Sequence, residues 1–165
     1  MMSEQQYAYF AEVPQGYTVD RPDGLWRRAG DTWEYLSLLD WQWHDVKATN
    51  VQTPPAPEVL HAVSEEHAAA LAADRQGWVQ YWAHYSSRRA WDDGRAPTTV
   101  VRRRRSPENI RDESFNSESQ WGPTMAAFYA FDGRSSTSPH LVELTAGEAE
   151  QLLQEIFGVT GATEL

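Results

Sequence analysis

The spacing of apolar residues changes within one segment near the end of the chain, residues 140–158, HLVELTAGEAEQLLQEIFG. A short apolar run comes first and is typical of a strand. Apolar residues three and four positions apart follow and are typical of one face of a helix. Thr145 and Glu148 have the spacing of a capping box, and Gly158 stands where a helix ends. The segment therefore predicts a strand, a capped helix and a stop.

A weaker copy of this pattern lies at residues 60–76, LHAVSEEHAAALAADRQ. Ser64 takes the N-cap position, and the copies are offset by 81 residues, from Leu60 to Leu141. The earlier helix is rich in alanine and has less apolar surface to bury. We therefore expect it to be the weaker of the two helices.

The repetition extends to other stretches of the two halves. Aromatic runs typical of a first strand align at an offset of 72 residues, from Tyr9 to Tyr81, and runs with consecutive arginines align at about 75. A third strand is expected in each half, with Trp41 aligned against Trp121. These segments are, in pairs, residues 7–13 and 78–85, 25–28 and 98–105, and 32–43 and 113–121.

The aligned segments predict an α+β fold. We expect a tandem duplication of a ββββα unit, with antiparallel strands in one sheet or two and helices packed on one face. The first repeat spans residues 1–77 and the second 78–165, and together they can form one compact domain. Between the strands, residues 47–58 are rich in proline and read as an extended linker. Residues 106–112 read as a turn region, and residues 124–131 as a short helix or strand.

The second half also resembles a group of known proteins. It contains VVRRRR, then DESFNSESQWGPT, then LVELTAGEAEQLL. In these features it is similar to small uncharacterised actinobacterial proteins that share an Arg-Arg strand, a Trp-x-Pro-Thr stretch and a capped acidic terminal helix. Trp121-Gly122-Pro123-Thr124 fits that pattern, whereas the first half departs from it with Trp41-Gln42-Trp43-His44. The resemblance implies an architecture and a source, and it implies no activity.

Composition narrows the class of protein. The chain has 165 residues, 8 of them tryptophan and none cysteine, so we expect a folded core without disulfides or thiolate metal sites. No apolar run has the length of a membrane span, and the N-terminus lacks the basic and apolar regions of a signal peptide. We expect a cytoplasmic protein that does not enter a membrane, with secretion by a route that uses no classical signal left open as the alternative. Its oligomeric state is left open.

Residues with catalytic or metal-binding chemistry form no recognisable motif. The five histidines lack the spacing of metal ligands, and the chain has neither a glycine-rich phosphate loop nor a G-x-S-x-G sequence. Glu65 and Glu66 are adjacent carboxylates, but the first turn of a helix already explains them. We therefore predict no cofactor, metal site or catalytic residue. A triad that only three-dimensional geometry reveals stays open.

Arginines form the strongest charge feature, residues 102–105. Because side chains alternate along a strand, Arg102 and Arg104 share one face and are candidates for contact with a phosphate or a carboxylate-rich surface. The interpretation we favour is structural. In it, these arginines pair with acidic residues across the next strand, and the first half repeats the feature with Arg27-Arg28 beside Glu34. The expected partners are Asp112, Glu113 and Glu118.

The net charge of −10 and the surplus of tryptophan suggest protein binding. An acidic surface steers a basic partner, and exposed tryptophans supply contact energy. The alternatives are that the charge only favours solubility and that the tryptophans only fill two small cores. As partner-binding residues we select Trp33, Trp91, Asp20, Asp23 and Asp31, with Arg102 and Arg104 added for the arginine face.

The function expected from the sequence is therefore non-enzymatic. We expect an acidic protein-binding module, such as an immunity or inhibitor protein that blocks a basic toxin or nuclease. One rival is a small hydrolase-like enzyme whose site the sequence does not reveal. A cleft with a perturbed carboxylate or histidine would favour it. The other rival is a nucleic-acid-binding module built on the arginine strands, which the negative charge disfavours.

Overall fold

The computed structural model describes residues 6–49, 51, 54–132 and 138–165. The chain divides into two compact units. The first contains the residues up to Trp78 together with Arg105–Ile110, and the second contains Val79–Arg104 and Arg111–Leu165. Within the described residues, no helix is both long and apolar enough to span a lipid bilayer.

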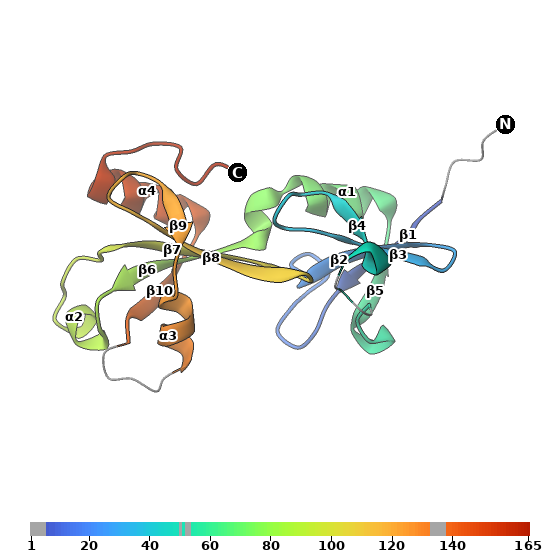
Figure 1. The fold of residues 1–165 in the computed structure, drawn as a ribbon, viewed down its shortest axis with the longest axis horizontal. Coiled ribbons are helices and arrows are strands. Elements are labelled where there is room, and N and C mark those ends of the chain that lie inside the picture. The colour runs from blue at the N-terminus through green and yellow to red at the C-terminus, as the bar shows by residue number, and fades with distance from the viewer. Residues whose placement is uncertain (1–5, 50, 52–53, 133–137) are drawn as a thin grey trace. The chain divides into compact units, whose positions relative to one another are not determined.

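The first unit is a five-stranded antiparallel sheet in the order β4-β3-β2-β1-β5. The α-helix that follows the last strand packs on this sheet through contacts with β1 (Figure 1). Short 3-10 turns connect the remaining segments. The elements are β1 (Ala8–Glu12), β2 (Gly24–Ala29), β3 (Thr32–Leu36), β4 (Trp43–Asp45), η1 (Val46–Ala48), η2 (Pro57–Val59), β5 (Leu60–Val63), α1 (Glu65–Ala73) and η3 (Arg75–Trp78).

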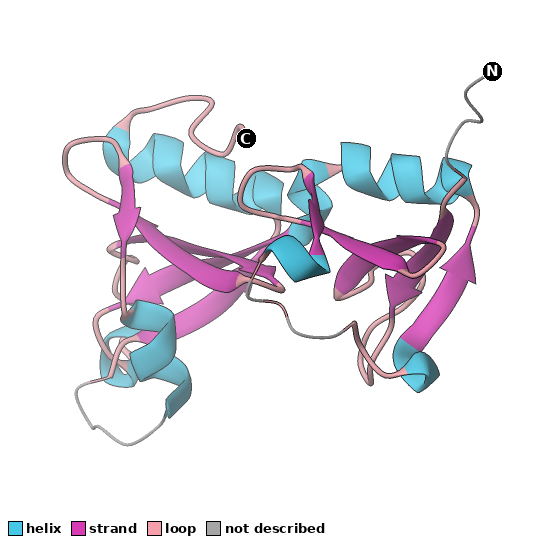
Figure 2. Cartoon of the chain, turned by 45° about the vertical axis from the view of Figure 1, so that its right-hand side comes forward, coloured by secondary structure: helices cyan, strands magenta, loops and turns pink. Residues whose placement is uncertain are grey.

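The second unit repeats this plan with the strand order β10-β6-β7-β8-β9. Its C-terminal helix, α4 (Ala146–Phe157), and the shorter helix α3 (Ala126–Asp132) lie on opposite sides of the sheet (Figure 2). The tip of the β7–β8 hairpin, Arg105–Ile110, belongs to the first unit. The elements are β6 (Val79–Tyr85), α2 (Arg88–Asp92), β7 (Thr99–Ser106), β8 (Asn109–Phe115), β9 (Trp121–Pro123), α3 (Ala126–Asp132), β10 (His140–Leu144) and α4 (Ala146–Phe157).

Strand order and register agree between the two units. Tyr9 lies opposite Val63 in the first sheet, and Tyr81 lies opposite Leu144 in the second. On the strand at the other side, Tyr9 lies opposite Arg27 and Tyr81 lies opposite Arg102. These pairs reproduce the sequence offsets of 72, 75 and 81. The α+β fold with two similar units, antiparallel sheets and helices packed on the sheets is confirmed.

The described residues of each unit form five strands rather than the expected four. The run at residues 32–43 is broken after Leu36 by a turn in which Trp41 takes a left-handed conformation with φ of 63°. A backbone hydrogen bond from Ser37 N to Gln42 O, 2.9 Å long, closes this turn. Leu36 then faces Trp43, as Phe115 faces Trp121. The counterpart of Trp121 is therefore Trp43, and the expected alignment with Trp41 is wrong.

The structure also shows what three other predicted segments form. The expected turn region at residues 106–112 contains the reversal of the β7–β8 hairpin and the first half of β8. Ser106 ends β7, and β8 begins at Asn109, so the reversal is confined to Pro107 and Glu108. Residues 124–131, which were open between helix and strand, contain most of α3. In the expected linker at residues 47–58, the described residues form no strand, but the 3-10 turns η1 and η2 occupy its two ends. Residues 50, 52 and 53 of this linker lie outside the described residues.

Both faces of each sheet are packed, and this uses many of the large rings. In the first unit, Leu25, Leu36 and Trp78 are buried in the cluster that includes Ala68 of α1. Trp26 and Tyr35 are buried on the opposite face with Val46. In the second unit, one face of the sheet packs against α4 and the other face packs against α3. Two-sided cores in two small sheets account for much of the tryptophan content.

The caps of the two long helices are those expected from the sequence. Thr145 Oγ1 accepts a hydrogen bond of 3.1 Å from Glu148 N, and Glu148 Oε1 accepts one of 2.9 Å from Thr145 N. Gly158 ends α4 in a left-handed conformation. Ser64 Oγ caps α1 by accepting a hydrogen bond of 3.0 Å from His67 N.

Candidate functional site: a groove of the first unit

The arginines selected from the sequence are held within the second sheet. Arg102 and Arg104 are each 7% exposed, and their Nη2 atoms lie 3.1 and 3.4 Å from Oε1 of Glu113. Arg103 forms a two-pronged ion pair with Asp112, with distances of 2.7 and 2.9 Å. The structural interpretation is thus confirmed for Glu113 and Asp112. Glu118, the third expected partner, is exposed in the turn after β8.

The first unit contains the equivalent arrangement. Arg27 Nε lies 2.5 Å from Glu34 Oε1, and the guanidinium stands 4.4 Å from the ring centre of Trp43. In the second unit, Arg102 stands 4.1 Å from the ring centre of Trp121. An arginine between a carboxylate and an indole is therefore part of the repeated scaffold, because both halves contain it at the same place.

The selected tryptophans lie in different surroundings. Trp33 belongs to the first unit and is half-buried, with its ring centre 5.4 Å from that of Phe10. Trp91 belongs to the second unit and is 39% exposed, with its ring centre 4.6 Å from that of His140. Trp91 is therefore the more accessible of the two.

The three selected aspartates all lie on the first unit. The side chain of Asp20 is 87% exposed and stands 3.7 Å from Nε2 of His67. Asp31 is exposed in the turn between β2 and β3. Asp23 is half-buried and lines an open groove with a volume of about 950 Å³. Asp20 lines only a small pocket of about 20 Å³. Of the three, Asp23 is therefore the one that lies in the large groove.

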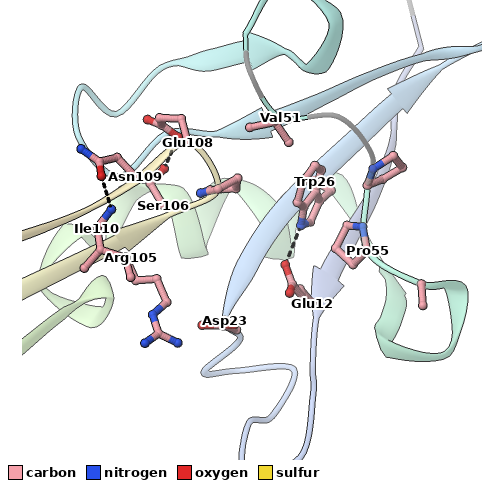
Figure 3. Close-up of a pocket in the computed structure, with 13 residues that line it drawn as sticks. Glu12, Asp23, Trp26, Val51, Pro55, Arg105, Ser106, Glu108, Asn109 and Ile110 are labelled. Carbon is pink, nitrogen blue, oxygen red and sulfur yellow. Dashed lines mark hydrogen bonds between the residues drawn. The ribbon is translucent and has the colours of Figure 1, made fainter. Parts of the chain in front are cut away.

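The groove has three walls that come from separate parts of the sequence (Figure 3). One wall is the end of the β1–β2 pair, and another is the proline-rich connection before β5. The third is the tip of the β7–β8 hairpin. The lining residues are, wall by wall, Glu12, Asp23 and Trp26; Val51, Pro54, Pro55 and Ala56; and Arg105, Ser106, Pro107, Glu108, Asn109 and Ile110.

Buried hydroxyl groups fix the hairpin wall. Ser106 Oγ accepts a hydrogen bond of 3.0 Å from Leu38 N and donates one of 2.6 Å to Glu108 Oε2. Ser37 Oγ donates to the other carboxylate oxygen of Glu108. Both serines are at most 5% exposed. Because Glu108 uses both oxygens to hold the tip in place, its first role is structural.

Glu12 is the most specifically positioned carboxylate of the groove. It lies at the end of β1, directly opposite Gly24, and its Oε1 accepts a hydrogen bond of 2.9 Å from Trp26 Nε1 (Figure 3). A Cβ atom on Gly24 would stand 2.8 Å from that oxygen. The absence of a side chain at Gly24 therefore makes the room in which the carboxylate reaches the indole.

The surroundings of Glu12 disfavour its charge. Burial raises the pKa of Glu12, the hydrogen bond from Trp26 lowers it, and the nearby charge of Asp23 raises it again, with a net increase. In the described part of the chain, neither Glu12 nor Asp23 has a cationic side chain within ion-pair distance. A carboxylate that is partly removed from water and has no cation beside it attracts an external one.

The mouth of the groove carries charges of both signs. Burial and the charge of Asp23 raise the pKa of Tyr17, whereas the charge of Arg105 lowers it. Tyr17, Asp23 and Arg105 therefore lie near one another. Arg105 offsets only part of the negative charge, because Glu12, Asp23 and Glu108 line the same groove. The groove as a whole is acidic, and its proline and isoleucine residues supply part of an otherwise polar lining.

Sequence reasoning selected Asp23 but missed the groove. Glu12 lies in a strand that reads as ordinary, and Gly24 reads as a turn residue. Their meaning depends on the cross-strand register, which places both beside Trp26. Nothing in the described part of the chain groups three or more histidine, aspartate or glutamate side chains as a metal site requires.

Comparisons with protein-family models, with curated proteins and with solved structures give no match for this chain.

Proposed function

We propose that this protein binds a basic protein partner through the groove of its first unit, as an immunity or inhibitor protein binds a toxin or nuclease. The observation that carries the proposal is Glu12. Its carboxylate is held by Trp26 in a partly desolvated position, and no cationic side chain of the described residues lies within ion-pair distance of it. Such a position weakens the fold when the carboxylate is charged, and a cation from a partner would relieve that cost.

The charge distribution supports the same unit as the binding region. By sequence, the first unit has 13 aspartates and glutamates against 6 lysines and arginines, a net charge of −7. The second has 11 against 8, a net charge of −3. A negative field around the first unit would accelerate encounter with a basic partner, and this effect weakens with salt.

Binding kinetics of short peptides test the proposal. Tryptophan fluorescence would follow the association of hexa-arginine, with hexa-glutamate as the control of opposite charge. We expect binding of hexa-arginine only. Its association should slow between low and physiological salt, while its dissociation changes much less. Failure of hexa-arginine to bind, or equal binding of hexa-glutamate, would contradict the proposal.

Charge variants separate steering from contact. Reversing Asp20 and Asp31 to lysine removes exposed charge outside the groove and should slow association alone. Replacing Asp23 with asparagine changes the groove itself and should also accelerate dissociation. If the two variants have the same effect on both rate constants, the groove is not the contact site.

A hydrolase is the second candidate, because the groove combines Glu12, whose pKa is raised, with a neighbouring carboxylate, Asp23. Such a pair can divide the roles of general acid and general base. Turnover of ester, phosphoester or glycoside substrates that survives repurification and disappears in Glu12→Gln would replace the binding proposal. The nucleic-acid alternative receives no such support, since Arg102 and Arg104 are engaged with Glu113. The cytoplasmic location and the actinobacterial resemblance stay predictions.

A further inference from the structure

We infer that the groove recognises an arginine side chain of the partner in preference to a lysine, with Glu12 as the acceptor that selects the guanidinium. The inference rests on the proposed function and names the chemistry of the ligand. It follows from the positions of Glu12, Asp23, Gly24 and Trp26 and from the apolar residues that form part of the groove lining.

The carboxylate of Glu12 presents one oxygen in a fixed orientation. Oε1 is occupied by the indole N–H of Trp26 at 2.9 Å, and Oε2 accepts no hydrogen bond from the described residues. Trp26 is only 3% exposed, so its indole is a rigid support. An acceptor held in this way favours a donor of matching geometry, because little side-chain freedom remains to be lost on binding.

A second acceptor lies on the neighbouring strand. Asp23 immediately precedes Gly24, the residue opposite Glu12, and its charge is close enough to raise the pKa of Glu12. Two carboxylates in the same groove suit a planar group with several N–H donors. A guanidinium has five such donors in a fork, whereas an ammonium group is a compact point charge with three.

The walls favour the less strongly hydrated cation. Burial is the main reason that the charged form of Glu12 is disfavoured, so the cation that joins it also leaves part of its water. A guanidinium is more weakly hydrated than an ammonium group and loses less on that transfer. Pro54, Pro55 and Ile110 line the same groove as the carboxylates, and Ile110 is 46% exposed. The methylene stem of an arginine can pack against this apolar surface.

Peptides of equal charge test the inference. We expect hexa-arginine to bind the intact chain about tenfold more tightly than hexa-lysine, the effect of about one additional charge-assisted hydrogen bond. In Glu12→Gln, which keeps an acceptor oxygen for Trp26, this preference should disappear. The matched control is Asp31→Asn, which removes the same charge from an exposed turn and should retain the preference.

A second variant tests the positioning without changing any charge. Gly24→Ala places a methyl group 2.8 Å from Oε1 of Glu12, which is too close, and should reduce the preference for arginine by displacing the carboxylate. Circular dichroism would check that this variant remains folded. Equal affinity for both peptides in the intact chain, or a preference that persists in Glu12→Gln, would overturn the inference and leave the proposed function standing. Absence of binding by either peptide would overturn both.

Discussion

Glu12 shows at the scale of a single residue how a binding site and a stable fold make opposite demands. Its pKa is raised in the folded protein, mainly by burial, so the folded state holds this proton more tightly than the unfolded chain does. Folding stability therefore contains a contribution that is present at low pH and decreases as the pH rises through the raised pKa. At neutral pH the charged carboxylate weakens the fold.

This sign gives a prediction for Glu12→Gln. The substitution removes the charge and keeps an acceptor for Trp26, so the variant should gain stability relative to the intact chain as the pH rises from 4 to 7. Urea unfolding at the two pH values measures the difference. Glu34→Gln is the control on the other face of the same sheet. It breaks an ion pair with Arg27 and should lose stability at pH 7. A larger loss for Glu12→Gln at pH 7 than at pH 4 would contradict the account.

Residues whose role depends on local spacing could be predicted from the sequence. The capping box of Thr145 and Glu148 is an example, because both partners lie within one turn. The pairing of Arg102 and Arg103 with acidic residues of the next strand could also be predicted, because side chains alternate between the two faces of a strand. The role of Glu12 could not be found in this way, because it requires Gly24 opposite it in the sheet and Trp26 two residues further along the same neighbouring strand.

At the scale of elements, α4 and α1 are equivalent helices that are buried to different degrees. Leu153 of α4 is fully buried, whereas Leu71 of α1 is half-buried and stands among alanines. Leu153→Ala should cost about 2–5 kcal/mol, and Leu71→Ala should cost less. Urea unfolding of both variants measures the two costs. An equal or larger cost at Leu71 would show that α1 contributes more than its sequence indicates.

The strands show why the number of elements was harder to predict than their type. The single strand predicted at residues 32–43 is a strand at both ends, in β3 and at the start of β4. Between them, Trp41 lies in the left-handed region of backbone conformation, which a tryptophan rarely occupies. Nothing about that residue signals a turn. Asp40 does carry a signal, because its Oδ1 accepts a hydrogen bond of 2.9 Å from Gln42 N, as aspartate does in many turns.

At the scale of the whole molecule, the duplication shows where the two units differ. The offset of 72 that relates β1 to β6 places His84 at the position of Glu12, and His84 lies opposite Thr99 where Glu12 lies opposite Gly24. Burial lowers the pKa of His84. The connection before the last strand also differs. It is proline-rich and lines the groove in the first unit, and it forms α3 in the second. The acidic groove is therefore a feature of the first unit that the duplication alone does not require.

The central claim is that a basic partner is recognised in this groove, and the indole N–H signals test it most directly. The chain has 8 tryptophans, so a ¹H–¹⁵N spectrum contains one indole signal for each. Hexa-arginine should shift the Trp26 signal, because its Nε1–H donates to Glu12. The signal of Trp91, an exposed ring of the second unit, should remain in place. A shift at Trp91 with no change at Trp26 would contradict the account and would place the binding surface in the second unit.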